Sequence, residues 1–567
     1  MFDLLISNAL IADGGGGEPC PGNLAVRDGR IAGVGPDVRG EARETVDASG
    51  RVLMPGIIDG HTHYDAQITW DPFADPSPAN GVTTIVMGNC GFTIAPCRPE
   101  DRDLTMRNLT HVEGMSLDAL RAGIRWEFES FPQYLDMLQR LGVGPNVAGF
   151  VGHSSVRTYV MGADASARAA TDAEIARMAE VVRGALEAGA VGFSSTTNEP
   201  HNGEGGVPMP SRLADERELR ALTRVLGESG RGVFMTTKGA CTSIEELEAL
   251  AHANRRPTLV SGFLHNPANP TRASGFLAEI AAARSRGARM WGEVTCCPLT
   301  MDFTLESAYM FEGFPAWMPA MTTHQAEELS AVYRDPAFRA AVKQDLVALR
   351  GKRAFNSEWD KLHVLEVTAP QNAALEGRSI ADIAAATGKE PLDALLDLGL
   401  SEGLRTRFTA TLLNSDDAEV AKLIADPDNY VTLSDAGAHL SFFCDAGFGL
   451  HLLGKWTRDL GVFTLGEAVR KLTAQPADIF GLKGRGRLRV GHWADLMLFD
   501  ARTVGRGKAR RVEDLPAGAA RIVRPAQGVH GVWVNGQRVV GDDGTVSQQR
   551  RPGQVLRDFE RNAADAY

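Results

Sequence analysis

Short apolar segments alternate with helical patterns along most of this 567-residue chain, and this alternation constrains the fold more than any other feature. Apolar runs of about four to eight residues suit buried strands, whereas recurrence every three to four residues indicates helices, as at 172–188 and 244–253. Strands joined through helices form parallel sheets, and eight such units predict a (β/α)8 TIM-like barrel of mixed α/β class. The predicted strands are residues 53–58, 83–88, 147–151, 190–194, 232–236, 258–263, 289–294 and 430–433.

The two ends of the chain carry β-rich patterns of a different kind. Asp28-Gly29 and Asn535-Gly536 each lie between strand-like segments, and both pairs favour the two-residue turn of a hairpin. Because about fifty residues of strand cannot easily bury a core alone, we expect the two ends to pair. The predicted organisation is a small discontinuous β-sandwich domain, a catalytic barrel and a C-terminal tail, at residues 1–54 plus 476–550, 55–475 and 551–567 respectively.

One long segment after the seventh predicted strand breaks the alternation. Residues 301–362 are rich in large apolar side chains, including Phe303, Phe311, Phe314 and Trp317. An apolar insertion at the end of a barrel that carries the chemistry favours a lid or a substrate wall. A separately packed subdomain is the alternative, because the same residues suit a core of their own.

Composition narrows the classes of partner. A hydrophobic content of 44% and a charged content of 23% are ordinary for a globular protein, and a net charge of -12 argues against nucleic acid or an anionic membrane as partner. Seven scattered cysteines do not suggest a disulfide framework. Without a basic leader or a membrane-length apolar run, the chain is expected to be cytoplasmic. Its composition leaves a homo-oligomer open.

Two histidines, His61 and His63, follow the first predicted barrel strand. Alternate side chains of a strand share a face, so both imidazoles can reach one cation. Most His-x-His pairs are ordinary surface or core histidines, but this pair lies at the carboxyl end of a strand, where barrels of this kind place their chemistry. Further polar residues follow other predicted strands, and we therefore expect a metal centre that includes Cys90, Lys238, His265 and Asp435.

Longer motifs around these residues resemble the amidohydrolase superfamily and, within it, the D-aminoacylase (N-acyl-D-amino-acid deacylase) family. The resemblance extends over nearly the whole chain. It implies a metal-dependent hydrolase that uses one or two zinc ions and cleaves small-molecule amides, namely N-acyl amino acids and foremost their D-enantiomers. The motifs are Pro55-Gly56-Ile57-Ile58-Asp59-Gly60-His61-Thr62-His63, Gly88-Asn89-Cys90-Gly91, Gly152-His153-Ser154-Ser155-Val156-Arg157, Pro210-Ser211-Arg212, Ser434-Asp435 and Gly486-Arg487-Leu488.

One departure from the family pattern concerns the fifth strand. The resemblance implies a histidine ligand there, but this chain has Thr236-Thr237-Lys238, and Thr237 is one candidate counterpart. A protonated lysine cannot bind a cation, so Lys238 is deprotonated, carboxylated to a bridging carbamate, or directed elsewhere. Because carboxylated lysine bridges two ions elsewhere in the superfamily, we expect a binuclear centre. Its first ion is assigned to His61, His63 and Asp435 and its second to His265, with Lys238 between them and Cys90 as a ligand or neighbour.

The expected chemistry is attack of an activated water on an amide carbonyl. Asp435 is the predicted base, which takes the proton of that water and passes it to the leaving nitrogen. His153 and His439 are candidates for contacts with the oxyanion or the substrate, whereas Arg157 and Arg212 suit either a substrate carboxylate or a structural ion pair.

The seventh strand is followed by Cys296-Cys297, which provides no group for a substrate carboxylate. This gap keeps two alternatives open. One is a hydrolase of another amide (cyclic, aromatic or peptide-like) with a carboxylated-lysine centre. The other is a barrel that serves only as a binding module.

Overall fold

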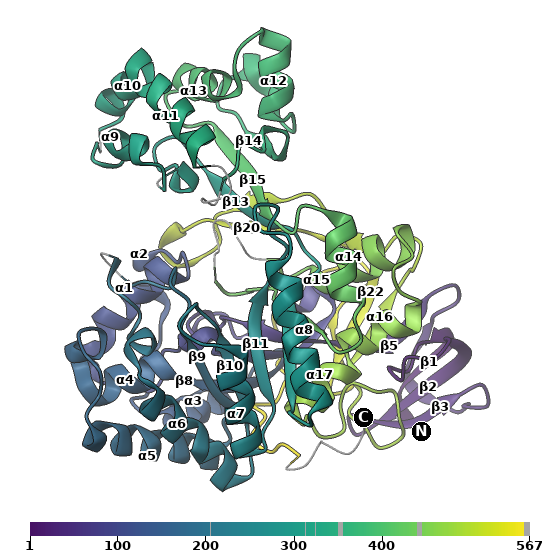
Figure 1. Ribbon diagram of the computed structural model, residues 1–567. Coiled ribbons are helices and arrows are strands. Elements are labelled where there is room, and N and C mark those ends of the chain that lie inside the picture. The colour runs from purple at the N-terminus through teal and green to yellow at the C-terminus, as the bar shows by residue number, and fades with distance from the viewer. Residues whose placement is uncertain (204–205, 312, 324, 350–354, 439–444, 561–567) are drawn as a thin grey trace. The chain divides into compact units, whose positions relative to one another are not determined.

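The computed structural model describes residues 1–203, 206–311, 313–323, 325–349, 355–438 and 445–560, and the chain divides into two units. The first unit comprises Met1–Phe263, Phe276–Cys296 and Ala421–Tyr567, and the second comprises Leu264–Gly275 and Cys297–Val420 (Figure 1). The domain boundaries expected from sequence remain a prediction.

A barrel of eight parallel strands forms the centre of the first unit, as the alternation predicts. The strands follow one another in chain order, and the two edge strands meet where Thr62 and Ala436 form a parallel bridge. The backbone N–H of His63 donates to the carbonyl of Ala436 at 2.7 Å and so helps to close the barrel. The strands are β6 (Ile57–Thr62), β7 (Val82–Met87), β8 (Asn146–Gly152), β9 (Gly192–Thr196), β10 (Val233–Thr237), β11 (Thr258–Phe263), β12 (Met290–Val294) and β16 (Tyr430–Val431).

The apolar run at 53–58 belongs to two sheets, so its prediction as a single strand is wrong. β5 (Val52–Pro55) joins the sheet built from the chain ends, whereas β6 begins the barrel. Gly56 separates them, and a Cβ at this position would lie only 2.1 Å from Oγ1 of Thr83 in β7. Apolar periodicity cannot detect this division, because both strands are buried on both sides.

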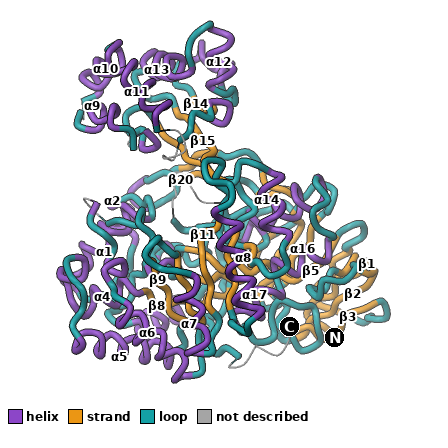
Figure 2. Tube along the Cα trace, viewed as in Figure 1, coloured by secondary structure: helices purple, strands orange, loops and turns teal. Residues whose placement is uncertain are grey.

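Helices connect the barrel strands and surround them (Figure 2). The predicted helices are confirmed as α5 (Asp172–Ala188) and α7 (Ile244–Asn254). Each begins with a capping box, formed by Thr171 with Glu174 in α5, which satisfies backbone N–H groups that would otherwise lack partners. The other helices are α1 (Arg102–Val112), α2 (Leu117–Gly123), α3 (Phe131–Leu141), α4 (His153–Met161), α6 (Glu216–Ser229), α8 (Arg272–Ser285, which begins in the second unit), α15 (Phe448–His451), α16 (Leu465–Leu472) and α17 (Ala474–Phe480).

Strands from both chain ends form one sheet in the order β23-β22-β17-β5-β1-β2-β3, with β4 paired to β1. Both predicted hairpins are confirmed, and their turn residues have positive φ: 52° and 73° at Asp28-Gly29, 47° and 77° at Asn535-Gly536. Leu24 and Trp533 lie in the buried core of this sheet. The strands are β1 (Phe2–Ile11), β2 (Cys20–Arg27), β3 (Arg30–Gly35), β4 (Ala42–Asp47), β17 (Leu496–Phe499), β22 (Val529–Val534) and β23 (Gln537–Val540).

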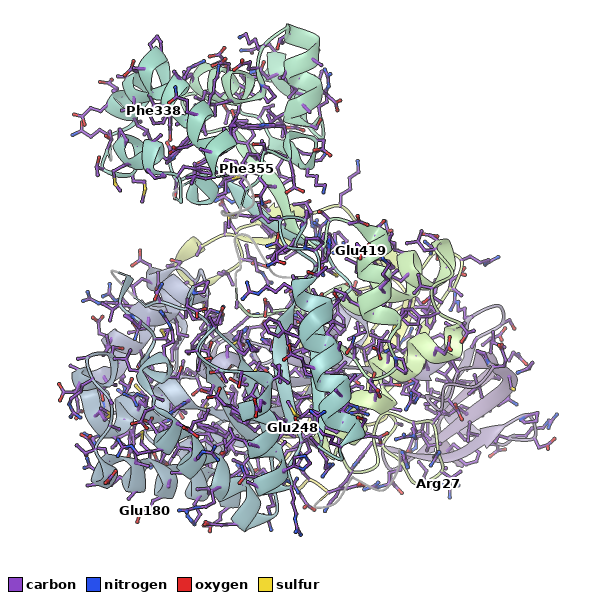
Figure 3. All side chains as sticks on the ribbon, in the orientation of Figure 1. Arg27, Glu180, Glu248, Phe338, Phe355 and Glu419 are labelled. Carbon is purple, nitrogen blue, oxygen red and sulfur yellow. The ribbon has the colours of Figure 1, made fainter. Side chains whose placement is uncertain are left out.

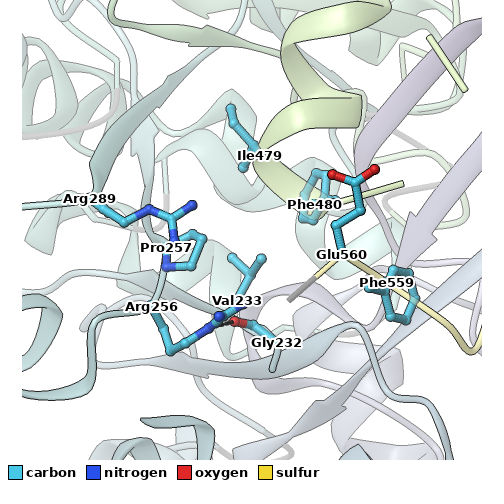
Figure 4. Close-up of a pocket in the computed structure, with 10 residues that line it drawn as sticks. Gly232, Val233, Arg256, Pro257, Arg289, Ile479, Phe480, Phe559 and Glu560 are labelled. Carbon is cyan, nitrogen blue, oxygen red and sulfur yellow. Dashed lines mark hydrogen bonds between the residues drawn. The ribbon is translucent and has the colours of Figure 1, made fainter. Parts of the chain in front are cut away.

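The amino ends of the barrel strands are covered by the described part of the C-terminal tail. Phe559 forms an antiparallel bridge with Leu482, and the N–H of Glu560 donates to the carbonyl of Gly481 at 2.8 Å. Figure 4 shows the space that remains beside Val233 and Arg256, a cavity of about 10 Å³. This volume holds about one water molecule, so this cavity does not admit a substrate.

The second unit has its own core. Phe311 stacks on Trp317 with ring centroids 4.6 Å apart, and Phe355 and Phe338 pack on this pair at 5.3 and 5.4 Å (Figure 3). The predicted insertion at 301–362 lies in this unit, and these aromatic contacts match the alternative of a separately packed subdomain. Its elements are β13 (Leu299–Phe303), β14 (Leu362–Glu366), β15 (Arg407–Leu413), α9 (Met318–Met321), α10 (Ala326–Arg334), α11 (Pro336–Ala348), α12 (Ile380–Thr387), α13 (Pro391–Ser401) and the start of α14 (Asp417–Ala425).

Two expectations from composition concern the described residues alone. Among them, no helix has the length and apolar character needed to cross a membrane. The six cysteines in the described ranges are all free thiols.

Candidate metal centre

Three side chains converge at the carboxyl ends of β6 and β7. His61 lies in β6, His63 follows it, and Cys90 lies in the short 3-10 turn Asn89–Gly91 after β7. One ligand atom from each lies within 4.8 Å of the others, and all three side chains are buried. Cys90 has a φ of 57°, a backbone conformation that non-glycine residues adopt rarely and that recurs at functional sites.

Asp435, which follows β16, completes this group. Its Oδ1 lies 3.4 Å from Nε2 of both His61 and His63, and Nε2 of His61 lies 3.5 Å from Sγ of Cys90. Ligands bound tetrahedrally at about 2.0–2.3 Å from zinc lie roughly 3.3–3.8 Å from one another. The donor types and their separations therefore fit a zinc ion without rearrangement of the chain.

Carboxylates hold the far side of each imidazole. Glu293 in β12 accepts a hydrogen bond from Nδ1 of His61 at 2.9 Å, and Oε1 of Glu113 lies 3.1 Å from Nδ1 of His63, at an angle too poor for a hydrogen bond. Such carboxylates orient ligand histidines and increase their basicity. Sequence reasoning missed both residues, although an acid inside the apolar segment that became β12 was a signal for Glu293.

The turn that carries Cys90 is held by hydroxyl and carboxylate groups. Oγ of Ser194 in β9 accepts from the N–H of Gly91 at 3.1 Å and donates to the carbonyl of Gly88. Oδ2 of Asp65 accepts from the N–H of Gly88 at 2.8 Å. These three bonds fix both ends of the turn, so the thiol reaches the two histidines through a braced backbone.

The charges of the group indicate a cation site. Burial would lower the pKa of His61, but the carboxylate of Glu293 and the thiolate of Cys90 raise this pKa well above its ordinary value. Burial would likewise raise the pKa of Cys90, but the imidazolium of His61 lowers it. The group therefore favours its proton-bound imidazolium and thiolate forms, and a divalent cation can displace those protons.

Comparisons with known proteins agree with this geometry. The model of the amidohydrolase family matches residues 44–540. The chain belongs to the amidohydrolase family. D-aminoacylase of Alcaligenes xylosoxydans xylosoxydans is 30% identical, over 98% of this chain and 97% of the relative. N-acyl-D-aspartate deacylase of the same organism is 28% identical over 98% and 95%. These relatives confirm the predicted family and the predicted class of enzyme, a metal-dependent amide hydrolase.

Solved structures give the same result. N-acyl-D-glutamate deacylase from Bordetella bronchiseptica, complexed with zinc and a phosphonate that mimics the tetrahedral intermediate, is 28% identical with a TM-score of 0.66, over 98% of this chain and all of the other. A D-aminoacylase structure described for its binuclear metal centre is 26% identical with the same score and coverage. The predicted barrel of mixed α/β class is thereby confirmed.

Thr237, not Lys238, faces the metal centre of this amidohydrolase. Oγ1 of Thr237 lies 3.2 Å from Sγ of Cys90. Nζ of Lys238 lies 4.0 Å from the centroid of the Phe276 ring and donates to the carbonyl of Gly239 at 3.1 Å. This arrangement corresponds to the third expectation for Lys238, a side chain directed elsewhere.

His265 lies in the second unit of the amidohydrolase. Its backbone pairs with Asn414, through an N–H that donates to Oδ1 at 2.7 Å and a carbonyl that accepts from the Asn414 N–H at 2.9 Å. The imidazole is buried, and neither ring nitrogen has a hydrogen-bond partner among the described residues. Unpaired buried nitrogens are compatible with the predicted role as a ligand, which stays a prediction.

His153 and Arg157 of the amidohydrolase belong to a buried network instead. His153 binds Oγ of Ser195 through Nδ1 and Oε1 of Glu218 through Nε2, both at 2.8 Å. The Arg157 guanidinium pairs with the other oxygen of Glu218 and donates to the carbonyl of Arg168 at 2.8 Å. Burial lowers the pKa of His153, and Glu218 opposes this effect. The polar atoms of this network are occupied within the protein.

The remaining predicted substrate contacts are Arg212 and His439. Arg212 is partly buried, pairs with Oδ1 of Asn202 and donates to the carbonyl of His201 at 3.3 Å. His439 lies outside the described residues.

Proposed function

We propose that this amidohydrolase is a zinc-dependent deacylase of N-acyl amino acids, and of the D-enantiomers in particular. The observation that carries the proposal is the group of two imidazole nitrogens, one thiol and one carboxylate, spaced 3.4–3.5 Å apart in three measured pairs. The relatives named for D-aminoacylase and for deacylation of N-acyl-D-aspartate support the substrate class.

His61, His63, Cys90 and Asp435 are the residues that would hold the ion. When bound, a divalent metal of this kind acidifies water and polarises a carbonyl group. Glu293 keeps Nδ1 of His61 engaged, so Nε2 remains directed at Asp435 and Cys90. Thr237 contributes a hydroxyl next to the thiol, where a further ligand histidine was expected.

Asp435 is the proposed proton carrier. Its side chain is 19% exposed, whereas those of His61 and His63 are 1% and 5% exposed, so it is the member of the group that substrate and water can reach. Its carboxylate takes the proton of the attacking water and delivers it to the departing amide nitrogen, which leaves poorly unless it is protonated. The location in the cytoplasm and the assembly as a homo-oligomer remain part of this proposal.

The first test measures zinc and hydrolysis together. Purified protein is analysed for metal per chain and assayed with N-acetyl-D-amino acids, with the L-enantiomers as controls. We expect D-selective hydrolysis that is lost on chelation and restored by zinc. His61→Ala lowers the rate more than about 100-fold and removes zinc, while the surface control His252→Ala retains both. Zinc-loaded protein inactive on all N-acyl amino acids contradicts the proposal.

Lys238→Met separates one ion from two. The contacts of Lys238 with Phe276 and Gly239 lead us to expect the same zinc content and a rate within about threefold of the unsubstituted protein. Loss of one of two ions, with loss of activity, supports the binuclear centre with carboxylated Lys238 instead.

A further inference from the structure

One segment of the first unit has a charge opposite to that of the whole chain. Residues 501–527, called the basic strap below, contain two acidic and seven basic residues, whereas the whole chain has a net charge of -12. The strap leaves the sheet of the chain ends after β17, and its strand β20 (Arg521–Val523) lies away from β1–β3 (Figure 1). The basic residues are Arg502, Arg506, Lys508, Arg510, Arg511, Arg521 and Arg524.

One end of the strap is attached to the loop that follows β6. Arg521 is buried and donates to Oδ2 of Asp75 at 2.5 Å and to the carbonyl of Asp75 at 2.6 Å. It also donates to Oδ1 of Asp514 within the strap at 2.8 Å. The turn Pro516–Gly518 packs against α2, where a Cβ at Gly123 would lie 3.0 Å from Cγ of Pro516. The strap therefore follows the loops on the side of the barrel that carries His63.

The strap also reaches the loop that carries Asp435. Arg506 forms an ion pair with Oδ2 of Asp445, and Nε of Arg524 lies 3.8 Å from the same oxygen. The N–H of Asp445 donates to the carbonyl of Ser434 at 2.9 Å, and Ser434 directly precedes Asp435. Two guanidinium groups thus face one carboxylate next to the metal centre, which leaves a net positive charge.

Arg524 differs from the other arginines near the site. Arg521 is bound by two carboxylates, Arg157 by Glu218, and Arg506 by Asp445. Arg524 makes only a long contact with Asp445, and its side chain is 27% exposed. A guanidinium in this state can form paired hydrogen bonds with an incoming carboxylate.

We propose that Arg524 of the basic strap binds the carboxylate of the substrate. The inference rests on the proposed deacylase function, in which every substrate carries a carboxylate. It supplies the cationic contact that the end of the seventh strand lacks, since Sγ of Cys296 there donates to the carbonyl of Phe448. Residues far apart in the chain would then provide the metal ligands and the group that recognises the amino-acid part.

The test compares two substrates and three variants of the full zinc-loaded enzyme. The substrates are an N-acetyl-D-amino acid and its uncharged C-terminal carboxamide. Arg524→Gln lowers kcat/KM for the acid about 10- to 100-fold, chiefly through KM, and changes that for the carboxamide less than about twofold. Arg524→Lys recovers part of the loss, because it restores the charge but not the paired geometry. Arg510→Gln, an exposed strap control, leaves both values unchanged.

The outcomes are distinguishable. Equal kcat/KM for Arg524→Gln and the unsubstituted enzyme on the acid overturns the carboxylate assignment while the deacylase function stands. An equal loss with Arg510→Gln, abolished by added salt, also overturns it, because the strap then attracts anions without a specific contact. An unsubstituted enzyme that cleaves no N-acyl amino acid overturns the proposed function itself. Zinc content and thermal unfolding of each variant identify any loss caused by misfolding.

Discussion

Two buried groups in this barrel pair histidine with carboxylate, but they differ in charge balance. In the group of His153, Glu218 and Arg157, the permanent cation of Arg157 neutralises Glu218, and both nitrogens of His153 are hydrogen-bonded. In the group of His61, His63, Cys90 and Asp435, the converging atoms are all electron-pair donors, and they have no permanent cation among the described contacts. The first group is complete as it stands, whereas the second requires protons or a metal ion.

This difference shows why residue type alone does not identify a metal site. Histidine and acid occur in both groups, and both groups lie at or beyond the carboxyl ends of barrel strands. What distinguishes them is whether the free donor atoms point toward one another or toward a built-in positive charge.

The largest expected difference concerns catalysis. Asp435→Asn keeps the size of the side chain but removes the proton-accepting carboxylate, so we expect kcat to fall about 10²- to 10⁴-fold. The matched change in the other group, Glu218→Gln, does not remove a proton carrier and leaves kcat per bound zinc within about threefold. Steady-state assays with zinc content measured in parallel check both variants. A fall of less than tenfold for Asp435→Asn contradicts the assigned role.

Stability should show the reverse order. Glu218→Ala leaves the fully buried guanidinium of Arg157 without its carboxylate, and loss of one partner of a buried ion pair costs about 3–5 kcal/mol. Denaturant unfolding measures this loss in the zinc-loaded protein. The comparison variant is Glu216→Ala, an exposed acid on the same helix, for which we expect less than about 0.5 kcal/mol. A cost below about 1 kcal/mol for Glu218→Ala indicates that water or another acid replaces it.

A smaller effect is expected from the carboxylate behind the metal ligand. Glu293→Gln weakens zinc binding about 10- to 100-fold, because the neutral amide supports Nδ1 of His61 less strongly. Competition with a chelator measures the affinity. Glu248→Gln is the matched control, since Glu248 lies 3.6 Å from Nε2 of His252 on the outer helix α7 and should not affect zinc (Figure 3). Unchanged affinity in both variants shows that His61 does not need this support.

The smallest effect is a pH dependence of the closed network. Burial lowers the pKa of His153 below its ordinary 6.5, so the unfolded chain takes up this proton at a higher pH than the folded one. The contribution of His153 to stability is therefore complete above pH 6.5 and is lost as the pH falls toward the folded pKa, by at most about 1.4 kcal/mol per pH unit. Unfolding across this range should show a slope that His153→Gln reduces. An identical slope in both proteins assigns it to other groups.

Much of the fold could be predicted because its signals are local. The periods of α5 and α7 and the turns at Asp28-Gly29 and Asn535-Gly536 depend on residues close together in the chain. The division at Gly56 could not be predicted in this way, since two buried strands of different sheets have the same apolar pattern. Packing against Thr83, which is distant in sequence, determines where one sheet ends and the other begins.

The sequence by itself determined the chemical types of the site, because imidazole, thiol and carboxylate groups directly after apolar strands are readable without coordinates. Only the tertiary structure decided which of them meet. One residue of register directs Thr237 toward Cys90 and Lys238 toward Phe276, since successive side chains of a strand point to opposite faces. Glu293 and Arg524 reach the neighbourhood of the site through strand pairing and ion pairs between distant segments, and such contacts leave no local pattern.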